Sequence, residues 1–248
     1  MADVFIDLWG VLTDSRKGRD AYRQRLGELL RARLGGDLET WIAAHDAAQA
    51  AYGKEAESAA TWTHGSWVEI VDRLDATYLR YLFERARVPP PATDILEYAR
   101  ALEAEVLAGM NVRFPDARTA LERLKTAGHR LFLATAATER SARATLAGAE
   151  LASFFDTIFT GTSQNARKLE LRYWERISNR VDIEVFRAFV VDDRLAYLRA
   201  AASVGFRCLL MDRDGRHAPE AMPPFVEATL NTLVGLPQYL ATAAPVRV

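Results

Sequence analysis

The sequence contains very little cysteine, which narrows the chemistry open to it. Cys208 is the only cysteine in the chain, so no internal disulfide can form and no cysteine cluster can bind zinc. Because Cys208 lies in the apolar run 206–211, we predict that it is buried as a small hydrophobic residue.

Long hydrophobic runs and an excess of one charge are also missing. No apolar stretch approaches the about 20 residues that span a bilayer, and the N-terminal segment lacks the pattern of a signal peptide. The formal net charge is -1, so no general positive field favours nucleic acid. We therefore expect a cytoplasmic protein that acts on a small-molecule substrate and binds neither nucleic acid nor a membrane. The sequence does not indicate an oligomeric state.

The remaining composition is that of a folded protein with a substantial core. Of the 248 residues, 50% are hydrophobic and 26% are charged. This length suits either one large domain or a core that carries an inserted subdomain.

The first part of the chain reads as one strand followed by a helical block. Residues 4–8 are short, apolar and β-prone, and Gly10 ends this strand. Helical spacing of apolar residues then covers 18–34, 38–52, 66–86 and 92–107. Gly35 and Gly36 separate the first two helices, Pro89–Pro91 separate the last two, and Thr93 or Asp94 is placed to cap the last helix.

The pattern changes near residue 111 to strands that alternate with helices. A helix that opens at Pro115-Asp116 carries Ala120, Leu121 and Leu124 on one face. Strands are expected at 130–134, 157–160, 188–191 and 206–211, with helices at 139–147, at 168–178 and before Gly205. Such alternation predicts an α/β fold with a doubly wound, parallel, Rossmann-like core. Residues 1–14 plus 111–248 would form this core, and residues 15–110 an inserted helical cap.

Polar residues stand at the carboxyl ends of three expected strands. Asp7, Thr135 and the pair Asp192-Asp193 should therefore meet at one edge of the sheet, where doubly wound proteins bind ligands. Two adjacent carboxylates after a hydrophobic strand are costly unless they meet a cation, and Mg²⁺ prefers such oxygen ligands. Considered singly, Asp7 and Thr135 also suit turn and helix caps, and the Asp-Asp pair suits a solvated turn.

Four segments resemble, in order, the motifs of the haloacid dehalogenase-like (HAD) hydrolases. They are Asp7–Leu12, Leu131–Thr135, Lys168, and Phe189–Asp193 followed by Ala200-Ala201 and Gly205. The segment from Val112 through Gly128 also resembles the family's approach to its second motif.

The resemblance implies a role for each motif residue. Asp7 would be the nucleophile that forms a covalent ester, and Thr135 would bind the transferred phosphoryl group. Lys168 would offset the negative charges, although Arg167 is a neighbouring candidate. Asp192 and Asp193, with Asp7 and the backbone carbonyl of Trp9, would hold Mg²⁺. The leading expectation is a magnesium-dependent phosphatase of a small phosphorylated metabolite that works through an aspartyl-phosphate.

Trp9 departs from the phosphatase pattern. Most phosphatases of the family have an aspartate at this position that protonates the leaving group, and an indole cannot do this. Asp14 is nearby, but a structural role in a turn is favoured for it.

The family's 2-haloacid dehalogenases carry an aromatic residue at the position of Trp9 and need no metal. A metal-free dehalogenase is therefore the first alternative, although no residue of the cap is identified as its halide-binding arginine and Arg31 and Arg33 are no more than candidates. A catalytically weak binding or regulatory protein is the second.

Three cap residues and two core residues complete the set of conspicuous side chains. Trp62, His64 and Trp67 surround Gly65 between two cap helices, where they could face a substrate, although structural packing is favoured. Tyr173 and Trp174 are expected in the core. The sequence does not identify the substrate.

Overall fold

The computed structural model describes residues 1–218 and 221–243. The chain forms two compact units: residues 1–15 with those from 112 onward, called the core unit, and residues 16–111, called the helical unit. These boundaries lie one residue from those expected for core and cap. Among the described residues, no helix is both long enough and apolar enough to cross a membrane.

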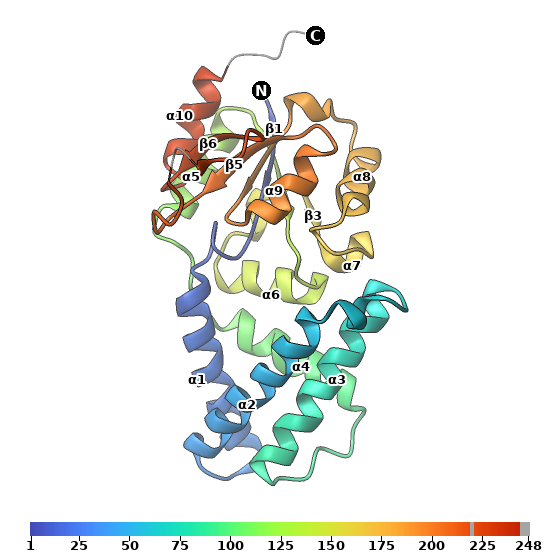
Figure 1. The fold of residues 1–248 in the computed structure, drawn as a ribbon. Coiled ribbons are helices and arrows are strands. Elements are labelled where there is room, and N and C mark those ends of the chain that lie inside the picture. The colour runs from blue at the N-terminus through green and yellow to red at the C-terminus, as the bar shows by residue number, and fades with distance from the viewer. Residues whose placement is uncertain (219–220, 244–248) are drawn as a thin grey trace. The chain divides into compact units, whose positions relative to one another are not determined.

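A six-stranded parallel sheet forms the centre of the core unit (Figure 1). Its order is β3-β2-β1-β4-β5-β6, and every neighbouring pair is parallel. The strands are β1 (Asp3–Ile6), β2 (Arg130–Ala134), β3 (Thr157–Phe159), β4 (Phe189–Asp192), β5 (Arg207–Met211) and β6 (Val226–Leu230). The predicted doubly wound parallel core is confirmed, including the pairing of the first strand with later ones.

Winding of the sheet reverses between β1 and β4. From β1 the chain proceeds through β2 to β3 on one side, and from β4 through β5 to β6 on the other. Ligand sites in doubly wound sheets lie at such a switch point, beyond the carboxyl ends of the strands. Asp7 directly follows β1 and Asp192 ends β4, so the fold brings both to this place.

Helices cover both faces of the sheet. They are α5 (Ala117–Thr126), α6 (Glu139–Gly148), α7 (Gly161–Gln164), α8 (Leu171–Arg180), α9 (Leu195–Ala202) and α10 (Gly235–Thr242), with 3-10 turns at Ala152–Phe154 and Val185–Arg187. One hydrophobic cluster includes Leu121 and Leu124 of α5, and the other includes Trp174 of α8 and Leu198 of α9. Cys208 is fully buried in the second cluster, as predicted.

Several core elements differ from the expectation. The helix predicted at 168–178 begins at Leu171, so Lys168 lies in the loop before it. That loop is held by a hydrogen bond from the Glu170 amide to the Arg167 carbonyl. Strand β6 and the helices α7 and α10 were not predicted at all.

The helical unit contains four long helices. They are α1 (Ser15–Leu34, whose first residue belongs to the core unit), α2 (Leu38–Glu57), α3 (Trp67–Ala86) and α4 (Ile95–Ala108), with a 3-10 turn at Ala59–Trp62. Gly35 and Gly36 have φ of 79° and 81°, a conformation that favours glycine, and they end α1. Asp94, rather than Thr93, caps α4 by accepting from the Glu97 amide.

Candidate active site

Asp7 stands where the two innermost strands end. Its backbone amide donates to the Val191 carbonyl of β4 at 3.0 Å, which fixes the residue between β1 and β4. Its side chain is almost buried, and one carboxylate oxygen, Oδ1, accepts from Lys168 Nζ at 2.6 Å. The other oxygen, Oδ2, has no hydrogen-bond partner among the described residues. Asp7 therefore keeps one oxygen uncommitted.

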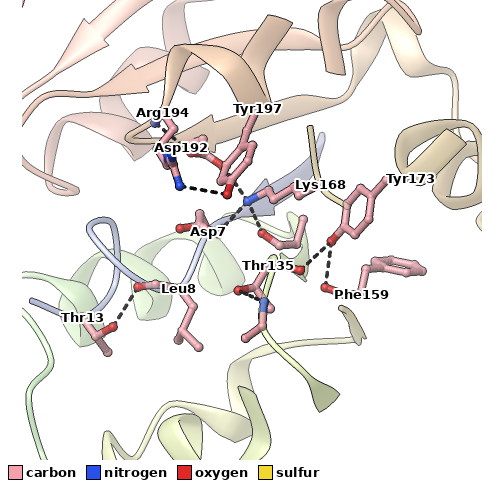
Figure 2. Close-up of polar contacts among 12 residues, drawn as sticks. Asp7, Leu8, Thr13, Thr135, Phe159, Lys168, Tyr173, Asp192, Arg194 and Tyr197 are labelled. Carbon is pink, nitrogen blue, oxygen red and sulfur yellow. Dashed lines mark hydrogen bonds and ion pairs between the residues drawn. The ribbon is translucent and has the colours of Figure 1, made fainter. Parts of the chain in front are cut away.

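Lys168 is a fully buried cation enclosed by oxygen atoms (Figure 2). Its Nζ lies 2.6 Å from Asp7 Oδ1 and 2.5 Å from Asp192 Oδ2, and it donates to the Ala134 carbonyl at the end of β2. Burial alone would lower the pKa of Lys168, but the carboxylates of Asp192 and Asp7 outweigh burial and raise it. The ammonium therefore stays charged, with three oxygen neighbours for its three protons.

Trp174 holds the loop of Lys168 in place, and Tyr173 holds the neighbouring strand ends. The indole Nε1 of Trp174 donates to the Lys168 carbonyl at 2.9 Å. The Tyr173 hydroxyl lies 3.1 Å from the Thr135 carbonyl and 3.0 Å from the Phe159 carbonyl, joining the ends of β2 and β3. Both residues are buried, as predicted, and their polar atoms also position the site.

The two aspartates that end β4 have different surroundings. Asp192 is fully buried: its Oδ1 accepts from the Arg194 amide at 2.8 Å, and its Oδ2 faces Lys168. Burial raises the pKa of Asp192, with Lys168 opposing and Asp7 adding to the rise. Asp193 is half-buried and pairs with no lysine or arginine among the described residues. Burial, and then the Asp7 charge, raises the pKa of Asp193 to about 6.

Gly10 makes room for Asp193. Its φ is +91°, and a Cβ at this position would lie 2.2 Å from Asp193 Oδ2. A glycine is therefore required twice over, by the backbone conformation and by the carboxylate that packs against it.

The donor set suits a hard divalent cation. Asp7, Asp192 and Asp193 each offer a carboxylate oxygen, and these atoms lie within 4.8 Å of one another. One lysine faces three carboxylates, and the hydrogen bonds of the turn leave the Trp9 carbonyl without a partner among the described residues. Oxygen ligands of this kind fit Mg²⁺. Asp193 is freer to ligate than Asp192, whose oxygens face Arg194 and Lys168.

Thr135 occupies the turn after β2. It is buried, its amide donates to the Phe159 carbonyl, and its Oγ1 accepts from the Ala137 amide at 3.3 Å. Figure 2 shows it beneath Asp7 and Lys168. The helix α6 is capped by Thr138 instead, so the capping role considered for Thr135 belongs to a neighbour.

Two residues near the acidic pair were not predicted as part of the site. Tyr197, in the first turn of α9, has its ring centroid 5.3 Å from Lys168 Nζ. Its hydroxyl accepts from Arg194 Nη1 at 3.0 Å. The only sequence signal for either was its position just after Asp192-Asp193.

The conspicuous residues of the helical unit mostly have local partners. The Trp62 indole donates to the Ala56 carbonyl at 2.8 Å, Trp67 is buried, and His64 is exposed. Arg33 forms an ion pair with Glu105. A role of these residues toward a substrate remains a prediction, as does one for the exposed Arg31.

Comparison with known proteins identifies the family. A model of haloacid dehalogenase-like hydrolases matches residues 4–205. The chain belongs to the HAD-like hydrolases. No curated protein matches it.

Solved HAD structures of both chemical types share the fold. A HAD phosphatase from Thermococcus onnurineus has a TM-score of 0.63 at 18% identity, covering 97% of this chain and 98% of its own. YfnB from Bacillus subtilis, bound to magnesium, has a TM-score of 0.65 at 15% identity over 96% and 98%. An L-2-haloacid dehalogenase from Xanthobacter autotrophicus, with chloropropionic acid covalently bound, has a TM-score of 0.60 at 15% identity over 98% and 100%. At these identities the likeness shows the fold alone.

Proposed function

We propose that this HAD-like hydrolase is a magnesium-dependent phosphatase of a small phosphorylated metabolite. The observation that supports this most is the charge of the site, where three clustered carboxylates face one buried lysine. Such a cluster is unfavourable without further positive charge, and a divalent cation would supply it. We also propose that the protein acts in the cytoplasm.

The proposed reaction has two steps at Asp7. Asp7 Oδ2 attacks phosphorus, and the bond from phosphorus to the ester oxygen breaks with its electron pair going to that oxygen, which takes a proton from solvent water and leaves as the alcohol. Water then attacks phosphorus of the aspartyl-phosphate, which releases inorganic phosphate and restores the carboxylate. In this proposal Lys168 holds Oδ1 by its hydrogen bond, Oδ2 is the attacking oxygen, and the Thr135 hydroxyl donates to a phosphoryl oxygen. A Mg²⁺ ion held by Asp7, Asp193, Asp192 and the Trp9 carbonyl would stabilise negative charge on the phosphoryl group.

Dehalogenation is the second candidate, and Trp9 is the observation that favours it. Its indole packs against the core cluster and offers no acid for a leaving group. A halide leaves carbon without protonation, so Asp7 could act alone. Against this candidate, the three carboxylates of the site would repel a 2-haloacid.

Turnover of both substrate classes tests the proposal. We expect the protein to hydrolyse p-nitrophenyl phosphate with Mg²⁺ and to lose this activity in EDTA or as Asp7→Asn. The exposed Asp182→Asn is the matched control and should behave as wild type. After the reaction is quenched with acid, mass spectrometry should find a peptide that is phosphorylated on Asp7.

Two other outcomes would favour the alternative functions. Release of halide from 2-chloropropionate in EDTA, without phosphatase activity, would establish the dehalogenase. A protein inactive on both would fit the binding or regulatory role.

A further inference from the structure

The turn that follows the acidic pair presents a guanidinium beside the site. Arg194 precedes α9, and its backbone amide is fixed by the Asp192 carboxylate at 2.8 Å. Its side chain is exposed, yet it does not extend freely into solvent. Nη1 donates to the Tyr197 hydroxyl at 3.0 Å, and the guanidinium carbon lies 4.7 Å from the centre of the Tyr197 ring. The guanidinium is thus held in place before any ligand arrives.

Most hydrogen-bonding capacity of this guanidinium is unused. A guanidinium has five N–H donors, and Tyr197 takes one of them. No carboxylate of the described residues forms an ion pair with Arg194. By contrast, Arg216, which also senses the charge of Asp193, is paired with Asp214. The Nε and Nη2 edge of Arg194 is therefore free, and a guanidinium edge of this type binds carboxylate or phosphate through two parallel hydrogen bonds.

Lys168 cannot serve a second anionic group. It is fully buried, and Asp7, Asp192 and the Ala134 carbonyl surround its ammonium. The Tyr197 ring is close to both cations. Its centroid lies 5.3 Å from Lys168 Nζ and 4.7 Å from the Arg194 guanidinium carbon. Their separation is therefore at most the sum of these distances, about 10 Å. A short substrate can span from the Asp7 side to Arg194.

We propose that Arg194, oriented by Tyr197, is a specificity-determining residue that binds a second anionic group, carboxylate or phosphate, on a short phosphate ester. This inference rests on the proposed phosphatase function and names its substrate class. The site would then prefer esters that carry a second negative charge a few bonds from phosphorus. The residue makes no bond to the reacting phosphoryl group, so its effect belongs to binding.

Non-hydrolysable ligands test this without requiring turnover. 3-Phosphonopropionate and propylphosphonate have the same chain length and differ in whether a carboxylate is present. By calorimetry with Mg²⁺, we expect wild type to bind the carboxylate compound at least about 10-fold more tightly. Propane-1,3-diphosphonate forms the third arm, and tighter binding than 3-phosphonopropionate would identify the second group as phosphate.

Variants of Arg194 and Tyr197, with a variant of Arg199 as control, separate recognition of the carboxylate from a general effect of losing positive charge near α9. Arg194→Met should bring the ratio of the two dissociation constants close to one, and Arg194→Lys should restore part of it, since lysine keeps the charge and loses the fork. Tyr197→Phe should give an intermediate ratio, because the hydroxyl anchor is lost. Arg199→Met is the matched control: Arg199 is an exposed arginine of α9 that lies against Phe225, 5.8 Å from its centroid. It should keep the wild-type ratio.

The possible results decide the two proposals separately. A wild-type ratio near one, or a ratio that Arg194→Met leaves unchanged, overturns the role of Arg194. If p-nitrophenyl phosphate is turned over in that case, the phosphatase proposal survives. If it is not turned over but Arg194→Met abolishes the ratio, anion recognition stands and the phosphatase proposal fails. Failure of 3-phosphonopropionate to bind also overturns the role of Arg194.

Discussion

Gly10 offers a test of the metal site at the scale of one residue. A methyl group there would lie 2.2 Å from Asp193 Oδ2, so Gly10→Ala must displace this carboxylate. The positive φ of +91° adds strain of about 1–3 kcal/mol. We expect calorimetry to show Mg²⁺ binding weakened at least about tenfold, because a ligand has moved.

Gly215→Ala is the matched control for Gly10→Ala. Gly215 also has a positive φ, of 64°, but a Cβ there meets nothing within 4 Å. This variant should lose stability in a thermal melt and keep its affinity for Mg²⁺. Equal Mg²⁺ affinity in Gly10→Ala and wild type would show that Asp193 is not a ligand.

Trp9→Asp distinguishes the candidate reactions. If the protein is a phosphatase, a carboxylate at this position should raise turnover by up to about 100-fold. The gain should be larger for alkyl esters than for p-nitrophenyl phosphate, because poor leaving groups need protonation. If it is a dehalogenase, the new negative charge should abolish turnover of 2-chloropropionate. Steady-state kinetics on the three substrates provides the measurement.

Loss of the indole must be separated from gain of the acid. Trp9 packs against the core cluster, and its removal leaves a void that costs up to about 3 kcal/mol. Trp9→Asn creates nearly the same void without an acid, so thermal melts of the two variants should agree. A folded Trp9→Asp with phosphatase rates equal to those of Trp9→Asn would contradict a missing acid at position 9.

How far the sequence predicts the site depends on the residue. Asp7 and Asp192 were expected because each ends an apolar run, and the parallel sheet brings such ends together. Lys168 has no local signal, since it lies in a loop after a short helix, and only the family resemblance singled it out. Arg194 and Tyr197 were missed because an arginine just before a helix and a tyrosine in its first turn are ordinary in sequence, and their contact appears only in three dimensions.

At the scale of elements, the acidic turn after β4 predicts how stability varies with pH in the metal-free protein. The pKa of Asp193 is raised from 3.8 to about 6, so between these values the folded state binds more protons than the unfolded state. The free energy of unfolding should therefore fall as pH rises from about 4 to about 6, by about 1 kcal/mol after allowance for solvent exposure.

Urea denaturation of wild type and Asp193→Asn across this range measures the effect. The asparagine variant should show a shallower decline, since its side chain does not titrate. Saturating Mg²⁺ should oppose the decline in wild type, because the metal binds the ionised carboxylate. A decline of equal slope in both variants would assign it to other groups.

The strands and helices were predictable in proportion to their burial. Strands β2, β4 and β5 are almost wholly buried and appear in the sequence as apolar runs. Strand β6 lies at the sheet edge, where its residues alternate between half-buried and exposed, and it includes Glu227 and Thr229. Only pairing with β5 makes it a strand. Helix α10 is short and contains Pro237, so its intrinsic helix propensity is weak. Its packing against the core stabilises it as a helix.

At the scale of the whole molecule, the helical unit was expected as an insertion because helical spacing replaces strand alternation between residues 15 and 110. The structure divides into a core unit and a helical unit in the same arrangement, and each boundary lies one residue from the expected one. The segments that flank the insertion could not be foreseen as partners. Thr13 forms an isolated bridge with Arg113, the Asp14 amide donates to the Val112 carbonyl, and the Phe114 amide donates to the Leu12 carbonyl.

This pairing predicts that the core unit folds without the helical unit. Because the Asp14 amide and the Val112 carbonyl are hydrogen-bonded at 2.9 Å, a Gly/Ser linker of about four to six residues can replace residues 16–111 at little entropic cost. Asp7, Thr135, Lys168 and the acidic pair all belong to the core unit. We therefore expect the excised core to unfold cooperatively in a thermal melt and to bind Mg²⁺ with affinity within about tenfold of the full chain. The same excised core carrying Asp193→Asn should bind much more weakly. A folded core that does not bind Mg²⁺, beside a full chain that does, would show that residues 16–111 are needed to complete the metal site.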